Sequence, residues 1–221
     1  MTYLAGEGQM GRGRPGDIRT QRRLLADDVF RRIADEILSG ELADGTMVRD
    51  HELADRLNVS RTPVREALMR LERIGLVEIE PSRFTRVTVV TPELIRQHRE
   101  LAGLMAGAAA RMAVVRLTED ELAHALELVD AVAAALPDPS AASQARHRLF
   151  SYLSRNSGNR AHHALMADVE IALTRSLGRM RLRPLCAPED EHAACADMRA
   201  AIVARDAEEI ERVIRLQHGI G

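Results

Sequence analysis

The chain has 221 residues, of which 29% are charged and 46% are apolar, and its formal net charge is −2. This composition is typical of a soluble globular protein with one sizeable core or two modest ones, and it excludes a strongly basic surface over the whole chain. No apolar run approaches the ~20 residues that a membrane span needs, and the two cysteines are too few for a disulfide framework. We therefore expect a cytoplasmic protein without a membrane partner, in which any nucleic acid binding depends on local charge.

The first segment of the chain, residues 1–20, is rich in Gly and Arg, has no apolar periodicity and is predicted to be a flexible arm. Helical spacing then predicts a first helix that ends at Ser39-Gly40 and buries Leu25, Val29, Phe30, Ile33 and Ile37. A short second helix follows and buries Leu53, Ala54 and Leu57. Ser60 is the expected N-cap of a third helix, which buries Val64, Ala67, Leu68 and Leu71 and ends at Gly75.

After the third helix, "LVEIE" and "FTRVTVV" alternate in polarity around "PSR", which predicts a β-hairpin. Three helices followed by a hairpin make a winged helix-turn-helix, here over residues 21–90. Residues 91–221 contain helical patterns and almost no strand signal, and six helices fit between their breaks. The predicted fold class is therefore mainly α, with an N-terminal winged helix-turn-helix and a C-terminal antiparallel helical bundle.

Two arginines at the start of the third helix, Arg61 and Arg65, are candidate base-reading residues. They are four residues apart, so they project from one side while the apolar positions face the core. An α-helix fits the major groove of DNA, where an arginine can donate two hydrogen bonds to guanine O6 and N7. The plain alternative is a solvated charged face, but the order of helices, cap and hairpin favours DNA binding, with the positive face confined to the third helix and the hairpin.

The stretch "LADRLNVSRTPVREALMRLERIGLV" resembles the GntR family of bacterial transcription regulators, and the similarity covers residues 22–90. The resemblance implies DNA contacts at matching positions of the second helix, the third helix and the wing tip. These positions are Arg49, His51, Ser60, Arg61, Thr62, Arg65, Ser82, Arg83 and Thr85. A glycine is common in the family where Ser82 stands, so the tip departs from the family pattern.

The second domain resembles the FCD subgroup of these regulators, through "TPELIRQHRELAGLMAGAAARMAVVRLTEDEL" and "RLFSYLSRNSGN". Many FCD members bind a divalent metal with one Asp and three His, next to a carboxylate effector. At the matching positions this chain has Arg146, Phe150, Cys195 and Gln217, and it has Ala102 and Ala106 where a polar pair is common. We therefore expect no metal cofactor, although a rearranged site from His147, His192, Cys195 and His218 stays open.

Without the metal ligands, small side chains at positions 102, 103, 106 and 107 are expected to leave room for an apolar or bulky effector. The candidate effector-binding residues are Arg99, Ala102, Ala106, Arg146, Phe150, Tyr152, Arg175, Cys195 and Gln217. A domain without a ligand, serving only dimerisation, is the alternative.

The sequence as a whole predicts a homodimeric repressor that binds double-stranded DNA at an inverted repeat and responds to a small molecule. The competing interpretation is an architectural DNA-binding protein that needs no effector. An enzyme lacks support, because the chain has no HExxH or GxSxG motif and no phosphate-binding glycine loop.

Overall fold

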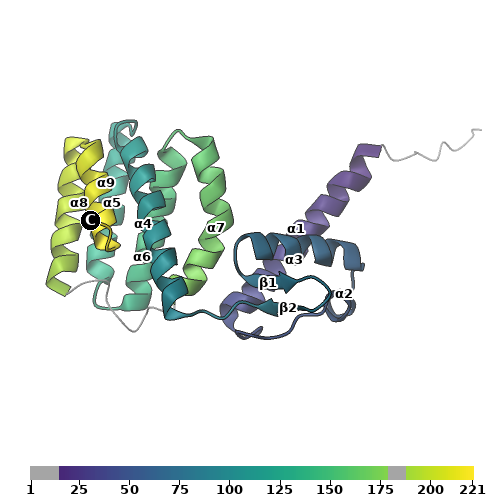
Figure 1. Ribbon diagram of the computed structural model, residues 1–221. Helices are drawn as coiled ribbons and strands as arrows, with labels where there is room; N and C mark the ends of the chain where they lie inside the picture. The colour runs from purple at the N-terminus through teal and green to yellow at the C-terminus, as the bar shows by residue number, and fades with distance from the viewer. Residues whose placement is uncertain (1–14, 179–187) are drawn as a thin grey trace, which may run out of the picture. The chain divides into compact units, whose positions relative to one another are not determined.

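The computed structural model describes residues 15–178 and 188–221. The chain divides into two compact units with the boundary between Thr88 and Val89. The helices and strands of each unit are labelled in Figure 1.

The first unit is a three-helix head with a two-stranded wing. It contains α1 (Pro15–Ser39), α2 (Asp50–Leu57), α3 (Arg61–Arg73), β1 (Val77–Glu80) and β2 (Phe84–Val87). The strands are antiparallel and pair Val77 with Val87. Helices α1 and α3 pack together over a buried core that contains Val29, Phe30, Ile33, Ile37, Val64, Ala67, Leu68 and Leu71. The predicted winged helix-turn-helix is confirmed, together with most of its predicted core.

Three details of the first unit differ from the sequence-based expectation. Residues 15–20 belong to α1 and not to a terminal arm, because Pro15 fits the first position of a helix and the amphipathic segment behind it propagates the helix backwards. The rest of the predicted arm lies outside the described residues. Leu25 is 40% exposed, since it lies at the edge of the buried stripe, next to Ala26. Leu57 is half-buried at the end of α2.

The second unit is a helical bundle, as predicted. In the described part of the chain it contains α4 (Pro92–Val114), α5 (Glu119–Ala135), α6 (Pro139–Asn156), α7 (Arg160–Gly178), α8 (Pro188–Ala204) and α9 (Ala207–Gln217). These helices run side by side in Figure 1. Within this described part, no helix is long and apolar enough to cross a membrane.

Small residues on α4 let α9 approach closely. Ala106, Ala110 and Ala113 pack in one core with Ile210 and Ile214 of α9. A Cβ atom built on the buried Gly103 would lie only 2.5 Å from the Cβ atom of His218. The apposition of these two helices therefore depends on the absence of a side chain at that position.

The helix starts in the bundle are fixed by capping residues. The Thr91 hydroxyl accepts a hydrogen bond from the Leu94 N–H at 3.2 Å, and Pro92 occupies the first turn of α4. Thr118 and Glu121 form a capping box at the start of α5. Such caps satisfy backbone donors that have no partner inside the helix.

Candidate DNA-reading surface and effector cavity

The two candidate base-reading arginines lie in the first turns of α3 with their side chains in solvent. The side chain of Arg61 is 62% exposed and that of Arg65 is 72% exposed. Val64 and Leu68, on the same helix, are buried against the core. Helix α3 therefore presents guanidinium groups on one side while its other side holds the unit together.

Both arginines contact one carboxylate, that of Asp50 at the start of α2. Arg61 Nη2 donates to both oxygens of Asp50 at 2.9 Å, and Arg65 Nε lies 3.7 Å from Asp50 Oδ2. The hydrogen bond from Arg61 holds the pKa of Asp50 below its usual range, against the opposing effect of partial burial. Asp50 therefore remains ionised at neutral pH.

The other predicted contact residues of the head surround these arginines in sequence. Arg49 Nη1 donates to Glu52 at 2.9 Å, and His51 is exposed. Ser60 is the N-cap of α3 by its backbone position, but its side chain makes no capping hydrogen bond. Because the predicted capping bond is absent, its hydroxyl stays available to another partner, and Thr62 beside it is exposed.

The wing tip holds the remaining predicted contacts. Ser82 and Arg83 are exposed, and Thr85 is half-buried in β2. Ser82 has φ +61°, in the left-handed region that glycine adopts most easily. This backbone conformation explains why a glycine suits the position.

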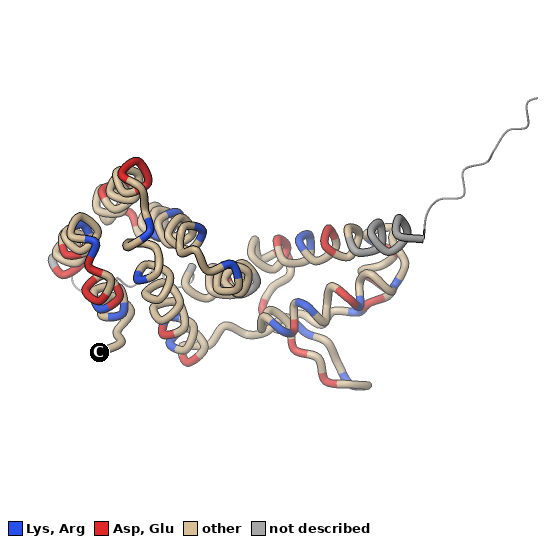
Figure 2. The backbone as a smooth tube through the Cα atoms, turned by 90° about the horizontal axis from the view of Figure 1, so that it is seen from above, with Lys and Arg blue, Asp and Glu red and all other residues tan. Residues whose placement is uncertain are grey.

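The positive face predicted for the head is narrower than the sequence indicates, because acidic residues pair with most of its arginines. Arg56 donates to Glu36 at 2.5 Å and Arg86 donates to Glu78 at 2.6 Å. Arg83 pairs with Glu80, and Arg70 pairs with Asp27 while its guanidinium lies over the Phe30 ring. Figure 2 accordingly shows acidic and basic residues interspersed along the helices and the hairpin.

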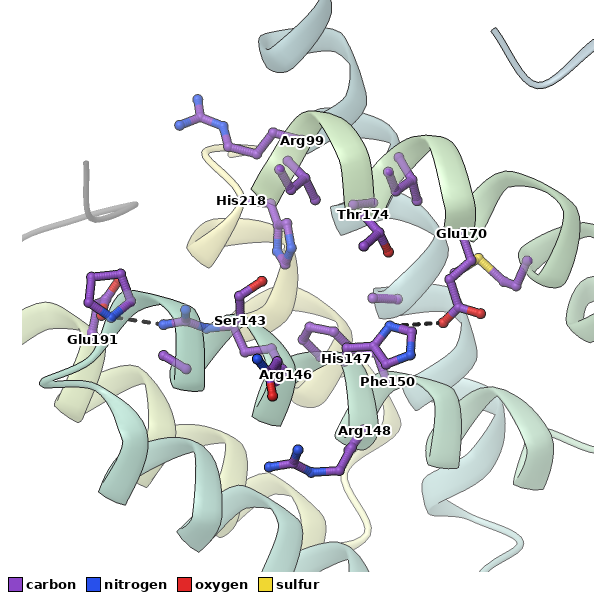
Figure 3. A pocket seen from close by; sticks show the side chains of 18 of the residues that line it. Arg99, Ser143, Arg146, His147, Arg148, Phe150, Glu170, Thr174, Glu191 and His218 are labelled. Atoms are coloured by element: carbon purple, nitrogen blue, oxygen red, sulfur yellow. Dashed lines mark ion pairs between the residues drawn. The ribbon is translucent and has the colours of Figure 1, made fainter. Parts of the chain in front are cut away.

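The second unit contains a cavity of about 470 Å³ among α4, α6 and α7, which is also lined by Glu191 of α8 and by His218 directly after α9. Its wall is mostly apolar, with Ala102, Ala106, Leu136, Phe150, Met166, Leu173 and Leu177. A volume of this size is in the range of small-molecule sites. Figure 3 shows the polar side chains that interrupt the apolar wall.

Two ion pairs lie in the cavity wall. Arg146 Nη2 lies 3.3 Å from Glu191 Oε2, and these side chains are 19% and 10% exposed. His147 Nδ1 lies 3.1 Å from Glu170 Oε1, which also accepts a hydrogen bond from the Ser151 hydroxyl at 2.7 Å. Both pairs are drawn with dashed lines in Figure 3.

His218 closes one side of the cavity and is held in a neutral form. Its Nδ1–H donates to the Ile214 carbonyl at 2.8 Å, and its ring centroid lies 5.9 Å from that of Phe150. Burial lowers the pKa of His218, and the guanidinium groups of Arg146 and Arg99 lower it further, against the opposing effect of the Ile214 carbonyl. The guanidinium groups of Arg146 and Arg99 therefore both lie close enough to His218 to disfavour its protonated form.

Five of the nine predicted effector-binding residues line the cavity: Arg99, Ala102, Ala106, Arg146 and Phe150. The other four lie elsewhere. The Tyr152 hydroxyl donates to the Glu121 carbonyl at 3.0 Å and so points to α5. Cys195 is buried in the bundle core, Arg175 is buried outside the cavity lining, and Gln217 is half-buried outside it.

The glycines expected to widen the cavity face α9 instead. A Cβ atom on Gly103 would meet His218 and Ile220, and one on Gly107 would meet Glu211 and Arg215. Only the alanines of this group, Ala102 and Ala106, line the cavity. The rotation of α4 about its own axis decides which of these small residues face the cavity, and the sequence pattern does not fix that rotation.

The residues at the family's metal-ligand positions do not fit a divalent metal. Arg146 is a cation, Phe150 has no donor atom and packs beside His218, and Cys195 lies in the core. Among the described residues, no three His, Cys, Asp or Glu side chains come together as a metal-ligand group. The alternative ligand set of His147, His192, Cys195 and His218 is therefore not brought together either. His147 pairs with Glu170, and His192 is exposed.

Several lining residues were not predicted as effector contacts, among them His218, Glu170, Thr174, Ser143 and Glu191. His218 replaces the predicted Gln217, because α9 ends at Gln217 and His218 turns back at the C-cap to reach the Ile214 carbonyl. The sequence feature that could have pointed to His218 is its position directly after the last helical residue.

Sequence comparison relates the two units to known families. Residues 25–87 match the family described as "Bacterial regulatory proteins, gntR family", and residues 97–217 match the FCD domain. The HTH-type transcriptional repressor RspR of Escherichia coli is 32% identical over 93 residues, which are 42% of this chain and 41% of RspR. The HTH-type transcriptional regulator Mce2R of Mycobacterium tuberculosis is 40% identical over 84 residues, which are 38% of this chain and 32% of Mce2R. The chain therefore matches less than half of the length of these relatives.

Solved structures share the fold over most of the chain. The E. coli protein McbR/YncC gives a TM-score of 0.58 at 22% identity, covering 88% of this chain and 93% of that one. A GntR-type putative transcriptional regulator from Rhodococcus sp. RHA1 gives a TM-score of 0.58 at 20% identity, with coverage of 88% and 93%. At this identity the likeness shows a common architecture.

Proposed function

Since the chain belongs to the gntR family of bacterial regulatory proteins and carries an FCD domain, we propose that it binds an inverted-repeat operator as a homodimer and represses transcription until a small molecule binds its helical unit. The family consists of DNA-binding transcriptional regulators and not of enzymes. The observation that carries the proposal is the pair of exposed arginines on α3, opposite a buried apolar face.

The proposed reading of DNA uses α3 in the major groove. Arg61 and Arg65 donate to guanine O6 and N7, and each good bidentate pair discriminates against a wrong base by ~1–3 kcal/mol. Ser60 and Thr62 hold phosphates at the start of the helix, where backbone N–H groups also point outward. Arg49 at the N-cap of α2, His51 on α2, and Ser82, Arg83 and Thr85 in the wing extend the contact to neighbouring backbone and groove positions.

The proposed dimer places two such heads on two half-sites about one helical turn apart, which requires an inverted repeat. An apolar stripe on α4 supports a second copy as the partner. Leu101, Leu104 and Val115 are 38%, 42% and 54% exposed, and their spacing puts them on one side of the helix. Pairing two copies through α4 would remove this stripe from water.

The proposed effector has an apolar body and one polar or anionic end. The alanines, leucines and Phe150 of the wall suit the body, while Arg99 near His218 suits the polar end. The Nε atom of Arg99 is buried and has no hydrogen-bond partner in the described part of the chain. Binding that favours one relative pose of the two heads would change operator affinity by linkage.

The head is tested by selecting binding sites from random duplexes and footprinting the selected operator with wild type, Arg65→Ala and Arg31→Ala. The two arginine side chains are both 72% exposed, but Arg31 lies on α1 and pairs with Asp28. We expect an inverted repeat with guanine in each half-site, lost affinity for Arg65→Ala and unchanged affinity for Arg31→Ala. Uniform, strongly salt-sensitive coating of any duplex would instead support the architectural alternative.

The effector proposal is tested separately, by thermal shift of the full chain against a panel of small organic acids and apolar neutral compounds. A compound that raises the unfolding temperature should also release the selected operator. A panel that stabilises the protein without any change in operator affinity would contradict the regulatory link.

A further inference from the structure

One carboxylate serves both base-reading arginines in this structure. Asp50 is the first residue of α2, and it accepts two hydrogen bonds from Arg61 Nη2 at 2.9 Å while Arg65 Nε lies 3.7 Å away. Its side chain is only 22% exposed, whereas those of Arg61 and Arg65 are 62% and 72% exposed. The Asp50 carboxylate is therefore less exposed than the two arginines that it contacts, and both arginines remain open to solvent.

The atoms that face Asp50 leave the opposite edges of the guanidinium groups unused. Arg65 approaches the carboxylate most closely with Nε, and its terminal Nη1 and Nη2 atoms make no hydrogen bond to another described residue. Arg61 uses one terminal nitrogen, Nη2, on Asp50, and its Nη1 and Nε atoms make no hydrogen bond to another described residue. A guanidinium has five N–H donors in a rigid fork, so holding one edge orients the rest.

An acidic group at this position has a second consequence. DNA phosphates repel a carboxylate, so Asp50 weakens the sequence-independent attraction of the surface that Arg61 and Arg65 form. The same group that orders the arginines thus opposes their use as plain phosphate binders. An exposed arginine without such a partner samples many rotamers and binds phosphates of any sequence.

We propose that Asp50 is the specificity-determining residue of the reading head: it positions Arg61 and Arg65 for guanine edges and lowers their affinity for the phosphate backbone. This inference rests on the proposed function of these two arginines. Asp50 itself touches no base. It acts through the arginines, and its removal has opposite effects on specific and non-specific binding.

The test compares Asp50→Asn with Asp55→Asn in the full chain, using fluorescence anisotropy with the selected operator and with a scrambled duplex at several salt concentrations. Asp55 is exposed on the same helix, five residues further on, so its side chain projects from a different side. The two variants therefore have the same net charge, and each loses one carboxylate from α2.

For Asp50→Asn we expect operator affinity to fall by about 2- to 5-fold per half-site, the scale of one well-formed exposed ion pair, while scrambled-duplex affinity rises. Discrimination between guanine and other bases at the contacted positions should shrink. Asp55→Asn should raise both affinities slightly and equally. Asp50→Glu, which keeps the charge, should retain the low affinity for scrambled DNA.

Coupling to the arginines separates positioning from a merely structural role. In an Arg61→Ala, Arg65→Ala background, Asp50→Asn should no longer alter base discrimination. Equal gains in both affinities for Asp50→Asn, or unchanged discrimination with an unchanged circular dichroism melt, would overturn the inference. Unchanged operator binding in the double-arginine variant would instead overturn the proposed function of α3.

Discussion

Two glycines on α4, Gly103 and Gly107, lie one turn apart, and replacing each by alanine should affect stability to a different extent. A Cβ atom at Gly103 would lie 2.5 Å from His218 Cβ, 2.8 Å from His218 Cγ and 2.9 Å from Ile220 Cδ1. At Gly107 the nearest atoms are Glu211 Cγ at 3.3 Å and the Glu211 carbonyl at 3.4 Å. The first position cannot accept a methyl group without movement, and the second nearly can.

The magnitudes follow from three effects. Replacing glycine by alanine inside a helix stabilises it by ~1 kcal/mol at either position. At position 103, overpacking costs about 1–3 kcal/mol, and displacing the buried His218 also weakens its bond to the Ile214 carbonyl, worth about 1 kcal/mol. We expect Gly103→Ala to destabilise the protein by about 1–3 kcal/mol, and Gly107→Ala to lie within ~1 kcal/mol of wild type.

The assay is urea unfolding of the full chain followed by far-ultraviolet circular dichroism, at one fixed protein concentration because dimerisation would add to stability. The refuting result is a Gly103→Ala variant as stable as Gly107→Ala. That outcome would mean that α9 can move away from α4 at no cost, contrary to the close packing described above.

Three further predictions concern other parts of the bundle. Because the pKa of His218 is lowered, its contribution to stability is complete above the ordinary histidine pKa of ~6.5 and is lost as pH falls through the lowered pKa. Urea midpoints measured against pH should therefore fall on the acid side. His218→Gln should make this fall smaller. Thr118→Ala removes the capping box with Glu121 and should lower the free energy of unfolding by about 0.5–2 kcal/mol, measured by the same urea assay. Ser143→Phe places a large side chain in the cavity wall at a half-buried position and should abolish the thermal shift by an effector while operator affinity stays at the wild-type value; a retained shift would place the ligand elsewhere.

The fold of the head was predictable because its signals are local. Apolar residues three and four apart, a proline in the first turn of α3 and a hairpin after Gly75 each specify an element without reference to distant residues. The charges of the head were less predictable, because their partners are far away in sequence. Arg70 meets Asp27 and Arg56 meets Glu36, contacts that depend on the packing of α1 against the other helices.

The residues that line the cavity were harder still to predict from the sequence. Matching motifs along the chain placed Ala102, Ala106, Arg146 and Phe150 in its wall, since each lies inside a long helix whose register a motif can fix. At the end of α9 the match named Gln217, whereas the backbone turns and brings His218 to the wall. Side-chain direction at helix ends depends on the cap geometry, which spacing alone does not encode.

The ion pair of Arg146 with Glu191 bears on where an effector can bind its polar end. Both side chains are largely buried, so removing one partner would leave an uncompensated charge. An anionic ligand at Arg146 would therefore compete with Glu191 and bring a second negative charge beside it. Arg99 lies near the same neutral His218, and its buried Nε atom has no hydrogen-bond partner among the described residues, so an anion bound there need not displace a carboxylate from Nε. Arg146 thus stabilises the cavity wall through Glu191, and for the proposed effector we expect Arg99 on α4 to be the anchor of the polar end.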